Sequence, residues 1–286
     1  MANLKEIRSR ISTVSSTMQI TSAMKMVSAA KLKKAQDAIT AMRPYANKLT
    51  ELLQNLSASL DGDAGSKFAD NREVKKVLVV AITSNRGLCG AFNSNIIKQS
   101  ILLNNETYAG QQVDFMAIGK KGNDILGKKG NVIANNSQVF DNLTFDNVSE
   151  IAEDLMAKFT EGQYDRIELV YNKFKNAATQ IVMTEQFLPI VPTEGGSQNS
   201  ADYIFEPSKP EIVEQLIPKS LKTQLFKAIR DSFASEHGAR MTAMHKATDN
   251  AGELKDQLTL TYNKARQAAI TNEILEIVGG AEALNN

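Results

Sequence analysis

The chain has 286 residues, of which 42% are hydrophobic and 23% charged, so it is long enough for one large domain or two smaller ones with an ordinary globular composition. Cys89 is the only cysteine, which excludes an internal disulfide, and no run of about 18 apolar residues predicts a membrane-spanning helix. The basic N-terminus is not followed by an apolar stretch, so no secretory signal is expected.

The net charge of +1 conceals a strong asymmetry along the chain. Residues 1–48 carry nine Lys and Arg against two acidic residues, whereas residues 77–218 carry 11 basic and 17 acidic side chains. The basic N-terminal segment is therefore expected to prefer an acidic partner, such as nucleic acid, anionic lipid or an acidic protein surface.

Residues 1–60 predict one long helix, because apolar residues recur at alternating spacings of three and four as in a coiled-coil seam. Pro44 removes one backbone hydrogen bond and predicts a kink or weak point. The predicted seam positions are Leu4, Ile7, Ile11, Val14, Met18, Leu32, Ala35, Ile39, Met42, Ala46, Leu49, Leu53, Leu56 and Leu60, with Thr21, Lys25 and Ser28 as polar interruptions.

Residues 74–192 predict a compact α/β domain, since short β-rich apolar runs alternate with helical patterns. This alternation is typical of a largely parallel sheet with right-handed crossovers. The expected strands are 77–83, 113–119, 131–134, 167–174 and 178–189, and the expected helices are 93–109 and 148–162.

Residues 208–286 predict a second long helix, which Gly279 and Gly280 are expected to end. One such helix from each end of the chain favours a long antiparallel coiled coil with an inserted Rossmann-like α/β domain. The predicted seam positions are Phe226, Phe233, Met244, Ala247, Ala251, Leu254, Leu258, Ala265, Ala268 and Leu275, with Arg230, His237, Arg240, Thr261 and Asn272 as polar interruptions.

The motifs that suggest chemistry all fall short of a catalytic or metal site. "GNDILGKK" (122–129) resembles a phosphate-binding loop, but Lys129 stands where a hydroxyl residue is needed, so a short helix is the simpler interpretation. "SNRGLCGAFN" (84–93) follows the first strand, where α/β sheets bind ligands, yet its glycines also suit a tight turn. Cys89 has no histidine near it in sequence, and His237 and His245 lack metal-ligand spacing. We therefore expect no catalytic, cofactor-binding or metal-binding residues.

Three classes of function remain open on these grounds. The two helices and the apolar end of the chain favour a mechanical part of a larger assembly, since exposed apolar patches mark interfaces. A basic coiled coil that binds nucleic acid is one alternative, although few aromatic residues accompany the basic segment. A nucleotide-binding α/β enzyme is the other.

Four segments resemble the γ subunit of the rotary F-type ATP synthase family. They are "ITSAMKMVSAAKLKKAQ" (20–36), "TSNRGLCGAFNSN" (83–95), "SEHGARMTAMHKATDNAGEL" (235–254) and "YNKARQAAITNEILEIVGGAEA" (262–283). The resemblance covers essentially the whole chain in order. Asn85 and Ala91 depart from the commonest family pattern, which has Asp and Gly there.

The resemblance implies a non-catalytic central stalk that transmits torque between the membrane c-ring and the β subunits, where catalysis occurs. It implies contacts with the α and β subunits of the hexamer, the ε subunit and the c-ring, and none with nucleic acid. The chain would lie peripherally at the cytoplasmic face of the bacterial inner membrane, reaching the membrane only through the complex. The lone Cys89 argues against a thiol switch of the chloroplast type.

The resemblance also implies roles for particular residues. Residues near Met24 would face acidic loops of β, Arg266 and Gln267 would form hydrogen bonds with β, and the apolar C-terminal end would turn in an apolar sleeve of the hexamer. The expected contacts with the hexamer are Met24, Lys25, Lys31, Lys33, Lys34, Arg266, Gln267, Ile270, Ile274, Leu275 and Val278. The region of Tyr203 and Glu206 would meet the c-ring and ε.

Overall fold

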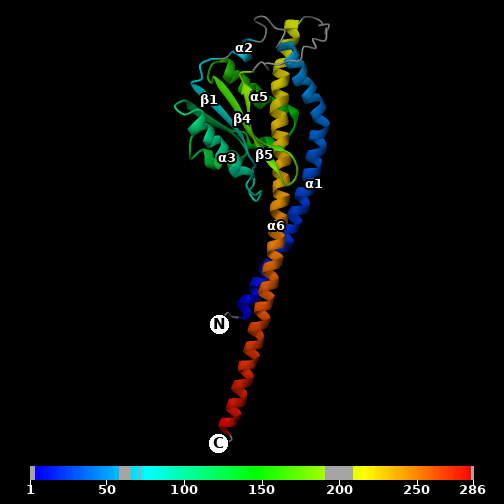
Figure 1. Cartoon of the computed structure of the whole chain (residues 1–286), viewed down its shortest axis with the longest axis vertical. Coiled ribbons are helices and arrows are strands. Elements are labelled where there is room, and N and C mark those ends of the chain that lie inside the picture. The colour runs from blue at the N-terminus through cyan, green and yellow to red at the C-terminus, as the bar shows by residue number, and fades with distance from the viewer. Residues whose placement is uncertain (1–3, 58–65, 71, 191–208, 285–286) are drawn as a thin grey trace. The chain divides into compact units, whose positions relative to one another are not determined.

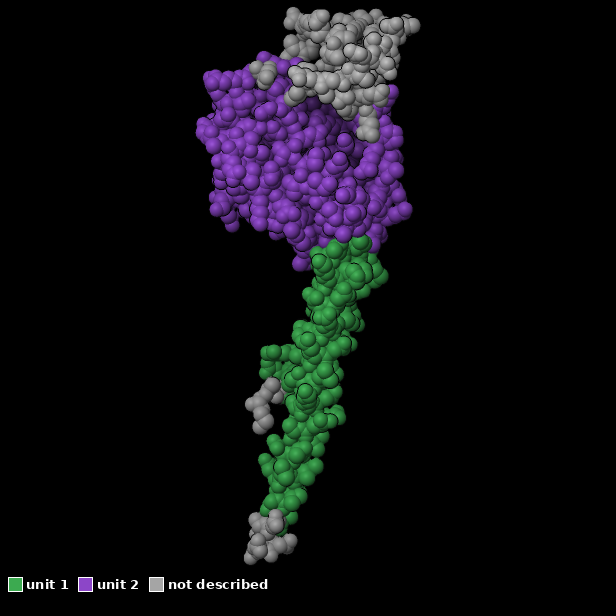
Figure 2. Space-filling model, viewed as in Figure 1, with its two compact units in different colours: residues 1–28, 241–286 green, residues 29–240 purple. Residues whose placement is uncertain are grey.

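The computed structural model describes residues 4–57, 66–70, 72–190 and 209–284. Contacts between residues divide the chain into two compact units, coloured separately in Figure 2. The first, which we call the shaft unit, comprises residues 1–28 and 241–286, and the second, the body unit, comprises residues 29–240. Helices α1 (Leu4–Ser57) and α6 (Lys209–Leu284) supply residues to both units.

The body unit is built on a five-stranded sheet with the strand order β3-β2-β1-β4-β5. Figure 1 labels β1, β4 and β5 of this sheet. The strands are β1 (Lys76–Ile82), β2 (Gln112–Ile118), β3 (Asn131–Asn135), β4 (Arg166–Phe174) and β5 (Gln180–Leu188). Neighbouring strands from β3 to β4 are parallel, while β5 pairs with β4 in the antiparallel direction. The expectation of a largely parallel α/β sheet is confirmed.

Helices and helical turns precede and connect these strands. They are α2 (Ser66–Ala69), α3 (Phe92–Leu102) continued by a π-helical turn (Leu103–Thr107), α4 (Lys120–Leu126), a 3-10 turn (Ser137–Phe140) and α5 (Phe145–Thr160). The start of α5 is fixed by Thr144, whose side chain accepts a hydrogen bond from the Asn147 amide at 3.3 Å.

Helices cover both faces of the sheet, which explains why the sequence of β1 is an unbroken run of apolar residues after Lys76. Successive β1 side chains point to opposite faces, so Leu78, Val80 and Ile82 join one apolar cluster while Val77, Val79 and Ala81 join another. The first cluster includes residues of α5 and α6, and the second includes residues of α3 and α4.

Helix α6 is part of the core of the body unit, which the sequence pattern did not predict. Leu221, Leu225 and Ile229 are at most 3% exposed and pack in the cluster that contains Leu78 and Val80. Every residue from 234 to 240 of α6 is buried. A helix buried on all sides belongs to the interior of a domain rather than to a two-helix seam alone.

Within the body unit, α1 runs antiparallel to α6. Arg43 lies beside Asp231, whereas Tyr45, further along α1, lies under the ammonium group of Lys219, which is earlier on α6. The predicted α1 seam is confirmed here, because Leu32, Ala35, Ile39, Ala46 and Leu49 are buried. Pro44 lies inside the helix, which continues past it to Ser57.

Within the shaft unit, α1 and α6 are joined through a mixed seam. Ile7 and Thr21 of α1 are buried, and the Thr248 hydroxyl of α6 donates a hydrogen bond to the Thr21 hydroxyl at 2.8 Å. Ala251 is also buried on α6. The predicted polar interruption at Thr21 is therefore a direct contact between the two helices.

Two expectations for α6 were wrong in detail. Leu254 is 45% exposed rather than in the seam, and the predicted seam positions Ala268 and Leu275 are exposed as well. Beyond Ala251 and its neighbour Gly252, the less exposed positions are 255, 258, 262 and 265. Counted from Ala251, the spacing runs four, three, four, three instead of three, four, three, four. Gly279 and Gly280 do not end the helix, which continues to Leu284 because the alanine-rich residues after them favour helix.

Candidate partner interface

The carboxyl ends of β1 and β4 form the place where an open α/β sheet most often binds a ligand, because the strand order reverses there. In this chain α6 lies on that edge. The Ser232 hydroxyl donates to the Ile82 carbonyl at 3.4 Å and the Ser235 hydroxyl donates to the Asn172 carbonyl at 2.9 Å. Both serines are at most 1% exposed, so a helix of the same chain fills the ligand position.

The loop of residues 84–91, which follows β1, is tied to α6 by Arg240, which also forms a buried ion pair within that helix. Arg240 bonds to Glu236 at 2.6 Å and donates to the carbonyls of Arg86 and Gly87 at 3.2 and 3.3 Å. Gly90 has φ +59°, which confirms the tight-turn interpretation of this glycine. The loop thus presents carbonyls to an arginine and does not wrap a phosphate with its amides.

Cys89 is enclosed beneath this loop and is 1% exposed. The Asn93 side-chain amide donates to Sγ at 3.2 Å, and Ser84 Oγ lies 3.8 Å from the sulfur. Burial raises the pKa of the Cys89 thiol above its ordinary value, against the smaller lowering effects of Ser84 and Arg240. A buried thiol with a raised pKa forms little of the reactive thiolate, which argues against a role as a nucleophile.

We predict that Cys89 in the native protein reacts with iodoacetamide at pH 8 more than about tenfold slower than the same thiol after denaturation, because the thiolate is the reactive form. Mass spectrometry of the alkylated peptide measures both rates. Equal rates in the native and the denatured protein would contradict the buried environment of this side chain.

The two histidines stand in different surroundings. His237 is 5% exposed, and burial, together with the charges of Arg240 and Lys31, lowers its pKa to about 4. His245 is exposed and lies 3.3 Å from Asp249 on the same helix. Among the described residues, no group of three or more His, Cys, Asp or Glu side chains is placed to hold a metal ion.

The phosphate-loop-like stretch 122–129 begins inside α4, as the simpler interpretation predicted. Gly122 is required there by packing, since a Cβ atom would lie 2.8 Å from Thr83 Oγ1. The Gly122 amide donates to that same hydroxyl at 2.9 Å and is therefore already bonded within the chain.

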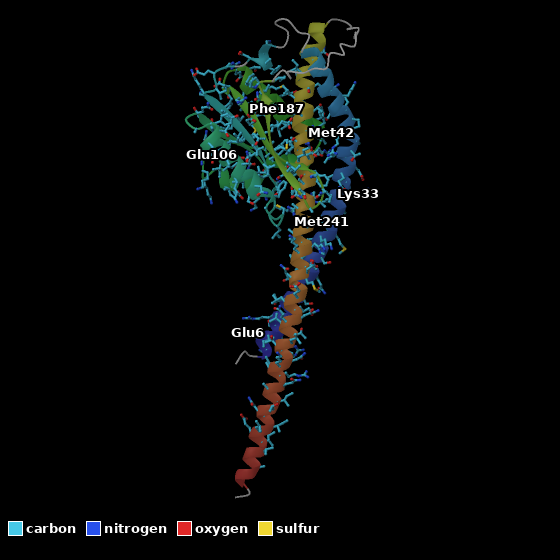
Figure 3. The ribbon with its side chains drawn as sticks, viewed as in Figure 1. Glu6, Lys33, Met42, Glu106, Phe187 and Met241 are labelled. Atoms are coloured by element: carbon cyan, nitrogen blue, oxygen red, sulfur yellow. The ribbon has the colours of Figure 1, made fainter. Side chains whose placement is uncertain are left out.

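The expected hexamer contacts are exposed or half-buried in the two units. In the shaft unit, Arg266 and Gln267 are exposed, and the apolar side chains of Ile270, Ile274, Leu275 and Val278 are 47–62% exposed. Met24 and Lys25 are half-buried on α1. In the body unit, Lys31, Lys33 and Lys34 are exposed on α1, where Figure 3 labels Lys33. Tyr203 and Glu206 lie outside the described residues.

Sequence reasoning missed a second apolar surface in the shaft unit. Ile20, Met26 and Val27 of α1 are 58–65% exposed. These residues lie beside the seam. Apolar residues at helix positions that should face solvent were the sequence signal that could have revealed this surface.

In the part of the chain that the structure describes, none of the helices combines the length and the apolar character that crossing a membrane requires.

The chain is similar to known proteins over its whole length. The model of the ATP synthase family matches residues 3–284. The ATP synthase gamma chain of Flavobacterium psychrophilum is 76% identical over 99% of this chain and 99% of its own length. That of Flavobacterium johnsoniae is 74% identical over the full length of both chains.

Solved structures show the same fold at lower identity. The central stalk and c-ring structure of the Tetrahymena thermophila mitochondrial ATP synthase contains a chain that is 26% identical, with a TM-score of 0.61 over 80% of this chain and 99% of its own. A chain in the OSCP/F1/c-ring structure of the Euglena gracilis mitochondrial enzyme is 22% identical, with a TM-score of 0.69 over 98% and 94%. The chain belongs to the ATP synthase family as a γ subunit of the bacterial F-type enzyme, the central stalk of its rotor.

Proposed function

We propose that this γ subunit transmits torque between the membrane c-ring and the catalytic β subunits, coupling proton flow to ATP synthesis and hydrolysis, and that it catalyses no reaction itself. The observation that carries the proposal is the pairing of α1 with α6 inside each unit. A single helix twists and bends readily, whereas two helices that share a packed seam resist both. The Thr21–Thr248 bond and the buried residues of the two seams supply that packing.

The assignment of partners rests on the surfaces and on the relatives. We propose that Ile270, Ile274, Leu275 and Val278 turn inside the hexamer of α and β subunits, since an apolar surface makes nondirectional contacts that impose no strong register on rotation. Arg266 and Gln267 of α6 would form hydrogen bonds with β.

The basic residues Lys31, Lys33 and Lys34, together with Met24 and Lys25, would face acidic segments of β. Each exposed ion pair there contributes less than about 1 kcal/mol to binding. Contacts of this strength orient the two surfaces toward each other but do not hold them tightly together. Tyr203 and Glu206 are proposed to meet the c-ring and the ε subunit. The chain would thereby lie at the cytoplasmic face of the bacterial inner membrane, held there by its partners.

Isolation from membranes in mild detergent tests the assignment. A tag on this chain is expected to recover α, β, ε and c subunits in one complex that hydrolyses ATP. Recovery of the chain without these subunits, or bound to nucleic acid in a salt-sensitive manner, would contradict it.

A further inference from the structure

Asp231 of α6 is an acidic residue in an unfavourable place. It is 2% exposed, and its Oδ1 atom accepts no hydrogen bond. The nearest opposite charge is the Arg43 guanidinium of α1, whose Nη2 lies 4.0 Å from that oxygen. This distance allows electrostatic attraction but exceeds the length of a hydrogen bond, so the carboxylate is only partly compensated for its loss of water.

Burial raises the pKa of Asp231 above its ordinary value, although Arg43, Lys227, Lys173 and the backbone of Phe174 oppose this shift. A raised pKa means that the ionised form is less stable in the folded chain than in the unfolded one, so at neutral pH the charge reduces stability. Asp231 is therefore not explained as a stabilising residue. A residue that costs stability and yet stands at a packed junction suggests a role in function.

The position of Asp231 indicates that role. It stands where α6 meets both α1, through Arg43, and the end of β4, through Lys173 and Phe174. Arg43 directly precedes Pro44, the residue that deprives α1 of a backbone hydrogen bond. The pair thus joins the two helices next to the missing backbone hydrogen bond of α1.

The other buried acid of α6 does not share this geometry. Glu236 bonds to Arg240 at 2.6 Å on its own helix, so its closest ion pair does not bridge two elements. The pair of Asp231 with Arg43, by contrast, joins α6 to α1.

We infer that the Asp231–Arg43 pair fixes the register of α1 against α6 in the body unit, so that the two helices do not slide along each other when torque is transmitted. A buried charge permits one alignment of two helices and penalises the others, because any shift leaves it without its partner. The inference rests on the proposed function and assigns two positioning residues to it.

The test uses the complete ATP synthase in membrane vesicles and two readouts. The first is proton pumping per ATP hydrolysed, and the second is hydrogen exchange of the α6 peptide around residue 231. Asp231→Asn keeps the shape of the side chain but removes its charge. It is expected to lower the number of protons pumped per ATP by about twofold or more, a factor that corresponds to the weakest interaction energies measured between contacting side chains. Hydrogen exchange of the peptide is expected to stay the same or become slower.

Variants of the partner and of the charge complete the design. Arg43→Gln should behave as Asp231→Asn does, while Asp231→Glu and Arg43→Lys, which keep the charges, should retain coupling. Glu153→Gln is the matched control, since it removes the acid of an exposed ion pair between α5 and Lys222 of α6 and should couple as the parent does.

Parental pumping in both Asp231→Asn and Arg43→Gln would overturn the inference. Faster hydrogen exchange in Asp231→Asn than in the parent would also overturn it, because it would show that Asp231 serves to pack the helices. A loss of coupling in Asp231→Glu equal to that in Asp231→Asn would overturn it for the same reason. If the parent complex holds this chain and hydrolyses ATP without pumping protons, the proposed function itself fails.

Discussion

Replacing Gly119 by alanine is expected to destabilise the body unit by about 4 kcal/mol or more, enough to prevent assembly of the complex. Gly119 lies between β2 and α4 with φ +121° and ψ 137°, a conformation open almost only to glycine. A Cβ atom there would lie 2.3 Å from the Thr83 carbonyl oxygen, which is backbone and cannot turn aside. Thr83 directly follows β1, a central strand, so the clash reaches the centre of the sheet.

Gly90→Ala provides the matched control. Gly90 also has a positive φ, +59°, but no atom lies within 4 Å of the added Cβ. This substitution should cost only about 1 to 2 kcal/mol, the strain of a left-handed residue. Recovery of the chain in the purified complex, and thermal unfolding of what is recovered, measure both variants. Equal recovery of the two would contradict the close approach at Thr83.

Introducing a charge at Leu258 is expected to weaken the α1–α6 pair of the shaft unit, whereas the same change at Leu254 is not. Leu258 occupies the observed seam and is half-buried, while Leu254 is 45% exposed. Leu258→Asp exchanges apolar contact for a partly desolvated carboxylate and should cost about 2 kcal/mol of local stability. ATP synthesis driven by a proton gradient should fall accordingly.

The two leucines form their own control, since the residue type and the change are identical. Hydrogen exchange of α1 residues 4–28 in the assembled complex reports the pairing, and vesicle ATP synthesis reports coupling. Faster exchange with Leu258→Asp alone is the expected result. Similar effects of both variants would show that the seam does not follow positions 255, 258, 262 and 265.

Periodicity predicted the strands and the first helix because their burial follows a simple rule. β1 is apolar on both faces since both are covered, and the α1 seam recurs at alternating intervals of three and four from Ile7 to Leu49. The seam of α6 was misplaced at Leu254, because a three–four and a four–three spacing fit an alanine-rich helix equally well. Only the partner helix decides between them.

The burial of residues 231–240 of α6 could not be predicted, since the buried side chains of this stretch are largely polar. Asp231, Ser232, Ser235, Glu236 and Arg240 are all at most 8% exposed. In a sequence pattern, polar residues such as these predict a solvent-exposed helix face. Inside a protein they need hydrogen-bond partners, such as the Ile82 and Asn172 carbonyls, which the sequence pattern does not reveal. The roles of residues such as Arg266 and Ile274 come from the resemblance and stay predictions, because a surface acquires its function from what covers it.

Direct observation of rotation tests the central claim that this chain turns as one mechanical part and performs no chemistry. Glu106 is exposed on the π-helical turn of the body unit, labelled in Figure 3, and a cysteine placed there can carry a probe. The hexamer would be fixed to a surface in a complex whose other reactive cysteines are replaced. The account predicts that the probe rotates in one direction when ATP is added and stops when ATP is exhausted. ATP hydrolysis at the normal rate with a stationary probe would contradict it.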